Sequence, residues 1–214
     1  MTATDRAYEF TKGRVLDSTY AGGELITEGE VAEALGMSRT PVREAFLRLQ
    51  SDGLLRLYPK RGALVVPVSV AEVDAVMETR MLVERFALDK VLAGGPAPAM
   101  AEELDRAISE QERRAAAGDA DGFVAVDREF HTTFVNEAGN PIITALYDSL
   151  RDRQRRMIIK SLLIDRRRID SILVEHRALT EAIRSGDLER ARSVLDEHLR
   201  GTLQLLHPGR AFAA

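Results

Sequence analysis

The segment DREFHTTF, residues 127–134, places two side chains capable of chemistry on a helical face that should be buried. At 3.6 residues per turn, Asp127 and His131 point in the same direction as Phe130 and Phe134. A carboxylate and an imidazole that face a core without partners would cost several kcal/mol. The sequence therefore predicts that other polar groups, or a bound ion, meet these two side chains inside the protein.

Two further histidines interrupt apolar stripes in later helical segments. His176 lies among isoleucines and leucines of a helix predicted over residues 167–185, and His198 has apolar neighbours in one predicted over 187–206. Each histidine alone would be explained by a hydrogen bond to a backbone carbonyl. Three imidazoles and a carboxylate together form a ligand set for a divalent metal such as Zn, Ni, Mn or Fe. The predicted ligands are Asp127, His131, His176 and His198.

Arg80 and Glu84 form a second pair of charged residues on an inward helical face, one turn apart. One interpretation is a buried ion pair. The other is that Arg80 offers its guanidinium fork to the carboxylate of a small organic acid bound beside the metal. Arg151, which adjoins an apolar stripe, is a second candidate for binding this effector.

The composition is that of a globular protein without signals for export or membrane insertion. The 214 residues contain 45% hydrophobic side chains, enough for a sizeable core in one large or two modest domains. Cysteine is absent, which excludes disulfides and thiolate metal ligands and suits a reducing cytosol. The N-terminus has no apolar signal core, and no run approaches the roughly 18 apolar residues of a membrane span. These features predict a cytoplasmic protein that makes no membrane contact.

Charged side chains are segregated near the N-terminus. The net charge is −4, yet residues 38–61 hold six basic and two acidic side chains, and residues 24–33 just before them are strongly acidic. This segregation gives a local positive surface that the average charge conceals.

The sequence TEGEVAEALGMSRTPVREAFLRLQSDGLL, residues 27–55, follows a helix predicted over about residues 5–19 and has the outline of a helix-turn-helix. Thr27 and Glu30 form a capping box that starts a short helix, and Gly36 ends it. A serine can cap the next helix, whose N-terminal end exposes arginines able to bond guanine bidentately. The side chains predicted to contact DNA here are Ser38, Arg39, Thr40 and Arg43.

Residues 54–68, LLRLYPKRGALVVPV, predict a β-hairpin, or wing, whose tip carries two cations. Lys60, Arg61 and Gly62 are the residues of the tip predicted to contact DNA. Exposed basic side chains on a small domain can serve solvation alone. Here the cap, the turn, the exposed arginines and the basic hairpin occur in the order that a winged helix-turn-helix requires.

The remaining chain has a helical pattern with five breaks, which predicts six helices. The breaks lie at residues 94–96, 118–119, 139–141, near 165 and at 186–187. The predicted fold is mainly α, with an N-terminal winged helix-turn-helix over residues 1–68 and an antiparallel six-helix bundle over 69–207. A tail over residues 208–214 completes the chain, and His207 before it is predicted to be exposed.

The segment EVAEALGMSRTPVREAFLRLQSDGLL resembles the GntR-type bacterial transcription regulators. The resemblance implies a cytoplasmic homodimer that binds a short palindromic operator in double-stranded DNA. It places Arg39, Thr40 and Arg43 at bases and phosphates, and Arg61-Gly62 in the minor groove. Gly29 stands where the family commonly has arginine, so one DNA contact expected from the family is missing.

Most of residues 69–206 resembles the ligand-sensing FCD domain of the FadR branch of these regulators, through Asp-x3-His followed by two spaced histidines on a helical bundle. This resemblance implies that Asp127, His131, His176 and His198 bind a metal that keeps positions open for a small effector, usually a carboxylate. The segment ETRMLVE resembles the family's R-x-x-x-E helix, which implies that Arg80 contacts the effector.

The favoured function is a metal-containing transcription regulator, a repressor controlled by a small carboxylate, and not an enzyme. A metal-dependent hydrolase is one alternative, with Glu175 or Glu197 as the base. Neighbours in a helix point about 100° apart, however, so both glutamates should face away from the site that the adjacent histidines face. A regulator that senses the metal itself is the other alternative.

Overall fold

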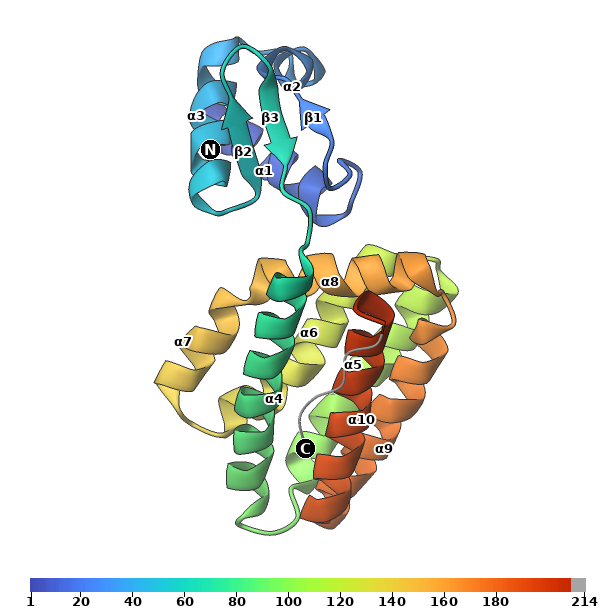
Figure 1. Cartoon of the computed structure of the whole chain (residues 1–214). Helices are drawn as coiled ribbons and strands as arrows, with labels where there is room; N and C mark the ends of the chain where they lie inside the picture. The colour runs from blue at the N-terminus through green and yellow to red at the C-terminus, as the bar shows by residue number, and fades with distance from the viewer. Residues whose placement is uncertain (209–214) are drawn as a thin grey trace. The chain divides into compact units, whose positions relative to one another are not determined.

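The computed structural model describes residues 1–208, which divide between Ser69 and Val70 into two compact units. Figure 1 shows the course of the chain through the first unit and then through the second. Of the tail predicted over residues 208–214, positions 209–214 lie outside the described residues.

The first unit combines three helices with a three-stranded antiparallel sheet within residues 1–69. The elements are α1 (Ala3–Leu16), β1 (Leu25–Ile26), α2 (Glu28–Leu35), α3 (Arg39–Ser51), β2 (Leu55–Tyr58) and β3 (Gly62–Val65). The strand order is β1-β3-β2, with Leu57 opposite Ala63 in the outer hairpin. The predicted hairpin is confirmed, whereas β1 escapes prediction because two residues are too few for an alternating pattern.

Side-chain hydrogen bonds fix where α2 begins. Thr27 Oγ1 accepts from the Glu30 N–H at 3.2 Å, and Glu30 Oε2 accepts from the Thr27 N–H at 2.7 Å, which confirms the capping box. Gly36 ends α2 with a left-handed φ of 61°. Ser38 stands at the N-cap of α3 but makes no side-chain capping hydrogen bond, so only its position follows the prediction.

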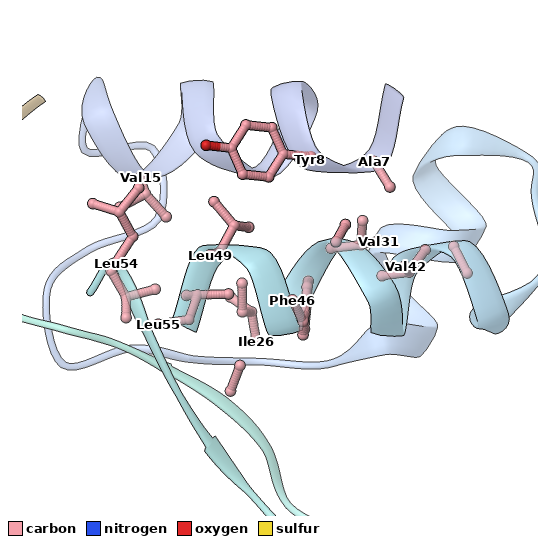
Figure 2. Close-up of a cluster of buried hydrophobic side chains, with 14 of the residues drawn as sticks. Ala7, Tyr8, Val15, Ile26, Val31, Val42, Phe46, Leu49, Leu54 and Leu55 are labelled. Carbon is pink, nitrogen blue, oxygen red and sulfur yellow. The ribbon is translucent and has the colours of Figure 1, made fainter. Parts of the chain in front are cut away.

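An apolar core holds the first unit together. Figure 2 shows Tyr8 of α1 facing Leu49 of α3, with Val15 of α1 beside Leu54, and Leu55 of β2 near Leu49. Phe46 and Leu49 are fully buried. Burying a side chain of this size contributes about 1.5–3 kcal/mol, so these contacts determine which face of α3 turns inward and leave its arginines outside.

The second unit consists of seven helices within residues 70–206. They are α4 (Val70–Leu92), α5 (Pro98–Ala116), α6 (Ala120–Glu137), α7 (Pro141–Ser149), α8 (Arg151–Ile164), α9 (Arg168–Ser185) and α10 (Leu188–Leu206). The mainly helical fold is confirmed, but the predicted number of six helices is wrong, because the helix expected over residues 141–164 breaks at Leu150. Leu150 has φ −86° and ψ −5°, and the break contains no Gly or Pro that would have predicted it.

The packing of these helices decides which inward side chains meet. α5 packs on both α6 and α9, while α4 packs on both α6 and α10. α10 also packs along α9, as Figure 1 shows. Polar side chains directed inward from α6, α9 and α10 can therefore meet in the interior of this unit.

His207 differs from its prediction. It is half-buried rather than exposed, and its Nδ1 lies 3.2 Å from Asp74 Oδ1 near the start of α4. The reason is that α10 runs to Leu206 against α4 and carries the next residue to that helix. Among the described residues, no helix is both long enough and apolar enough to span a membrane.

Candidate functional site

Four side chains predicted as metal ligands come together in the second unit. Asp127 and His131 extend from α6, His176 from α9 and His198 from α10, and each is buried. One potential ligand atom from each lies within 4.8 Å of those of the other three. The one-turn spacing in α6 supplies two of these atoms from a single helical face, as the sequence predicts.

The distances at the centre of this cluster fit a shared ion. His131 Nε2 and His198 Nε2 are 3.1 Å apart. Two nitrogens bonded to one ion at about 2.0–2.1 Å lie about 3.0–3.4 Å apart at ordinary coordination angles. Asp127 Oδ1 and His176 Nε2 are 3.7 Å apart, and neither buried atom has a hydrogen-bond partner among the described residues. A cation between the four groups would satisfy both.

Each histidine of the cluster turns its other ring nitrogen toward an oxygen acceptor. His131 Nδ1 lies 2.8 Å from Glu84 Oε2, His176 Nδ1 lies 2.9 Å from Gln111 Oε1, and His198 Nδ1 lies 2.7 Å from Glu175 Oε2. A proton on Nδ1 that is donated to such an acceptor leaves Nε2 as the lone-pair nitrogen that faces the centre. The hydrogen bonds of His176 and His198 therefore favour the tautomer that a metal requires, and the negative charge of Glu84 beside His131 Nδ1 favours a proton on that nitrogen.

Two of these outer residues differ in what the sequence predicted for them. The sequence did not single out Gln111. Its place after Leu104 and Ile108 on the buried stripe of α5 could have indicated an inward polar side chain. Glu175 is considered above as a base of an enzyme, but its carboxylate contacts His198 of α10 instead. A carboxylate that contacts the outer nitrogen of an imidazole orients the ring, so Glu175 positions His198, one of the predicted metal ligands.

Arg168 holds the Glu175 carboxylate in place. This buried guanidinium donates from Nη1 to Glu175 Oε1 at 2.7 Å and from Nη2 to the His198 carbonyl oxygen at 2.8 Å. Gly201 packs against it, since a Cβ there would lie 3.1 Å from Nη1. Arg168 thus ties the start of α9 to the turn of α10 that carries His198.

The electrostatic surroundings keep two of the imidazoles neutral. Burial lowers the pKa of His176 well below its usual value, and the neighbouring His198 and His131 lower it further. Burial also lowers the pKa of His198, against the opposing effect of the Glu175 carboxylate. A neutral imidazole is the form that binds a metal.

Arg80 joins this cluster through Glu84. Arg80 Nε donates to Glu84 Oε1 at 2.7 Å, so the predicted ion pair is present, and both side chains are buried. Tyr147 of α7 donates to the same oxygen at 2.9 Å. Burial alone would raise the pKa of Glu84, but Arg80 and His131 outweigh it and hold that pKa below its usual value. One carboxylate therefore connects the effector candidate, a metal ligand and α7.

Arg151 lines a cleft that none of the four cluster side chains lines, and its role as a second effector contact stays a prediction. It is exposed and lines a cleft of about 770 Å³ between α6 and α8. Arg128 and Thr132 of α6 line this cleft. Each comes one position after a residue of the cluster, Asp127 or His131, and therefore faces away from it.

The first unit presents a concave surface between α3 and the wing, and the hollow has a volume of about 820 Å³. Its lining includes Arg39 and Arg43 of α3 and the wing residues Lys60, Arg61 and Gly62. Ser38 and Thr40, the other two predicted contacts, are exposed at the same end of α3. The N-terminal end of α3 and the tip of the wing thus form one basic surface.

Three contacts shape this surface. Arg43 Nε donates to Glu28 Oε1 at 2.9 Å, and the Arg39 guanidinium lies over Gly29, where a Cβ would be 3.3 Å from Nη2. Gln50, a residue that the sequence did not single out, accepts from the Leu57 N–H of β2 at 3.0 Å and so fixes the wing to α3.

Gly62 has a structural reason for its identity. Its φ is +106°, and a Cβ there would lie 2.4 Å from the Ile26 carbonyl oxygen. Only glycine allows β1 to approach β3 this closely.

Each of the two units matches a known protein family. Residues 3–65 match the model of the family described as bacterial regulatory proteins, gntR family, and residues 75–201 match that of the FCD domain. The chain is 30% identical over 200 residues to an HTH-type transcriptional regulator in an unstable DNA locus of Streptomyces ambofaciens, covering 92% of the chain and 82% of that protein. It is 24% identical over 185 residues to the gluconate operon transcriptional repressor of Bacillus subtilis, covering 85% and 75% respectively.

Solved structures show the same architecture. A GntR transcriptional regulator from Rhodococcus sp. RHA1 superposes with a TM-score of 0.77 at 24% identity, covering 98% of this chain and all of that one. The metal-free FCD domain of TM0439 superposes with a TM-score of 0.52 at 28% identity, covering 65% of this chain and 96% of that one. The matching families and relatives are transcriptional regulators, so the alternative of a hydrolase is set aside. The chain belongs to the GntR family of bacterial regulatory proteins and carries a C-terminal FCD domain.

Proposed function

We propose that this GntR-family regulator is a metal-containing repressor of the FadR branch, whose operator binding is controlled by a small organic acid. The observation that carries the proposal is the convergence of Asp127, His131, His176 and His198 within 4.8 Å, inside a chain that also presents a basic winged helix-turn-helix. The solved FCD domain of TM0439 is a metal-free form, which supports metal binding as a property of similar FCD domains. The name of the Bacillus subtilis gluconate operon repressor supports repression as the mode of action.

The residues of the cluster suit a divalent ion of the Zn, Ni, Mn or Fe type. Three imidazole nitrogens and one carboxylate oxygen leave one or more coordination positions open in a five- or six-coordinate site. When bound, the ion supplies positive charge and a coordination position for a carboxylate. Glu84, Gln111 and Glu175 orient the three rings through Nδ1, so the ligand nitrogens are already directed inward before an ion binds.

Arg80 is the proposed second contact of the organic acid. A guanidinium carries five N–H donors, and the contact with Glu84 uses the Nε donor. A charge-assisted contact from Arg80 would therefore recognise the carboxylate of the acid without releasing Glu84. Glu84 also contacts Tyr147 of α7 and His131 of α6. A shift of Arg80 would therefore displace Glu84 and change the contacts of both helices. Such a shift is our proposed origin of the change in operator affinity.

On DNA, the exposed end of α3 would enter the major groove while the tip of the wing lies against the backbone and the minor groove. Arg39, Thr40 and Arg43 are the proposed base and phosphate contacts, with Ser38, Lys60, Arg61 and Gly62 beside them. A palindromic operator requires two copies of this surface, so the acting species is proposed to be a homodimer in the cytoplasm, where a bacterial chromosome lies.

The test uses the full-length protein and a duplex that the protein itself selects from random-sequence DNA. Operator affinity is measured for metal-loaded and chelator-treated protein, with a panel of small mono- and dicarboxylic acids and with the matching alcohols. At least one acid should change the affinity by about five-fold or more, and only in the metal-loaded protein. If metal alone controls operator binding and no acid has an effect, the protein is a metal sensor. If neither has an effect, the proposed control is wrong.

A further inference from the structure

Glu28 is an acidic residue on a surface otherwise suited to DNA. It is the first residue of α2, and its Oε1 accepts from Arg43 Nε at 2.9 Å. Both residues line the concave surface that also includes Arg39, Lys60 and Arg61. The Glu28 side chain is 24% exposed, whereas that of Arg43 is 69% exposed. The carboxylate is therefore more shielded from solvent than the guanidinium that it contacts.

The stability of the fold gives a poor reason for this contact. An ion pair this exposed contributes little to the free energy of unfolding, because water and salt screen it. A carboxylate on this surface also repels DNA phosphates, so it weakens the binding of any sequence. Glu28 must therefore serve a purpose other than general affinity if its position is functional.

The atoms used in the contact indicate that purpose. Arginine recognises guanine by donating two hydrogen bonds to O6 and N7, for which the terminal nitrogens Nη1 and Nη2 suffice. Glu28 engages Nε, the nitrogen next to the aliphatic stem in the planar guanidinium group, and leaves the terminal pair for a base. Holding Nε fixes the plane of the group before DNA arrives, which reduces the ordering that binding requires.

The next residue acts on the other arginine of α3. Gly29 has no side chain, and a Cβ at this position would lie 3.3 Å from Nη2 and 3.6 Å from Cζ of Arg39. The start of α2 thus binds Arg43 through a carboxylate and leaves room for Arg39 through a missing side chain.

We propose that Glu28 is a positioning residue for base recognition: it holds Arg43 through Nε so that the terminal nitrogens address a guanine, and its charge suppresses binding to non-specific DNA. The inference rests on the proposed contact between Arg43 and a base. It predicts opposite effects on the two classes of DNA when Glu28 is neutralised, with specific binding weakened and non-specific binding strengthened.

The experiment compares Glu28→Gln with Glu33→Gln, which removes one negative charge from an exposed position of the same helix. Affinities of the full-length proteins are measured at one salt concentration for the selected operator and for a scrambled duplex of equal length. The ratio of operator to scrambled affinity should fall about ten-fold in Glu28→Gln and change less than about two-fold in Glu33→Gln. Glu28→Asp keeps the charge but shortens the reach, so it should lower the ratio without strengthening binding to the scrambled duplex.

Arg43→Ala separates the two levels of the proposal. If Arg43→Ala binds the operator normally, the base contact of Arg43 is wrong. If Arg43→Ala is defective but Glu28→Gln strengthens binding to both duplexes equally, as Glu33→Gln does, only the positioning role is overturned. In the Arg43→Ala background, Glu28→Gln should leave the ratio unchanged, and a continued fall would also overturn the positioning role. Circular dichroism melting of each variant shows that the comparison is between folded proteins.

Discussion

Glu84 of α4 and His131 of α6 lie 2.8 Å apart, from Oε2 to Nδ1, with both side chains completely buried. The other oxygen of the same carboxylate accepts from Arg80. One side chain thus orients a proposed metal ligand and neutralises the proposed effector contact. The ion-pair and effector interpretations of Arg80 are therefore compatible, since the pair with Glu84 leaves the guanidinium further donors.

His176→Ala should abolish stoichiometric metal in the purified protein. His176 Nε2 is a buried nitrogen with no hydrogen-bond partner among the described residues, and its removal leaves two imidazoles and one carboxylate at the centre. Elemental analysis measures the result, and binding of non-specific DNA should be unchanged. His207→Ala is the matched control, because His207 pairs with Asp74 and not with the cluster. Full metal occupancy in His176→Ala would show that the three histidines are ordinary core residues.

Arg43→Ala should weaken binding of the selected operator by about 1–3 kcal/mol, the contribution of a bidentate base contact. The side chain is exposed near the start of α3 and lines the basic surface. Gel-shift titration at fixed salt measures the change. Arg177→Ala removes an exposed cation from α9, outside the basic surface, and should bind the operator like the wild type. Wild-type affinity in folded Arg43→Ala would remove this residue from the recognition set.

Arg80→Met should reduce the affinity for the organic acid by about ten-fold or more, because a charge-assisted hydrogen bond contributes roughly 1.5–3 kcal/mol. The variant also leaves Glu84 without its buried cation, although Tyr147 and His131 remain beside it. Calorimetric titration of metal-loaded, folded protein with the identified acid measures the affinity. A loss of stability with unchanged affinity would leave Arg80 as the ion-pair partner of Glu84 and nothing more.

Gly62→Ala and Arg61→Ala should act on the wing in different ways. The Gly62 change introduces a Cβ 2.4 Å from the Ile26 carbonyl oxygen at a φ of +106°, so it should destabilise the protein by more than about 1 kcal/mol. Arg61 is exposed, so its loss should leave the urea midpoint unchanged and reduce the salt dependence of DNA binding by about one unit of log–log slope. Equal stability of both variants would contradict the close approach of β1 to β3.

Asp5 should remain ionised well below the usual range of aspartate. Hydrogen bonds from the Thr2 side chain and backbone, followed by the contact with Arg48, lower its pKa to about 2. Since the folded pKa lies below the unfolded one, the stabilisation is present above about pH 4 and is lost as the pH falls toward 2. NMR titration from pH 6 to 3 should show the Asp5 carboxyl still largely ionised at the lower end, and the stability difference between wild type and Asp5→Asn should shrink below about pH 4. A titration midpoint near that of a free aspartate would contradict the hydrogen bonds that Thr2 donates to Asp5.

Much of the first unit follows from local rules. The capping box of Thr27 and Glu30 and the left-handed Gly36 depend on residues within one turn of each other, so the sequence specifies them. The strand β1 does not follow, because Leu25 and Ile26 form a strand only where β3 supplies hydrogen-bond partners. The break at Leu150 is similar, since no residue there prevents a helix from continuing.

The sequence by itself determined that Asp127, His131, His176 and His198 face inward, because a helical period of 3.6 residues fixes the direction of each side chain relative to the apolar stripe of its own helix. Only the tertiary structure decided which group each of them meets. Glu84, Gln111 and Glu175 reach the three histidines from other helices, and Arg151 emerges into a separate cleft. Contacts of this kind depend on the rotation and axial position of one helix against the next, which no local spacing along the chain encodes.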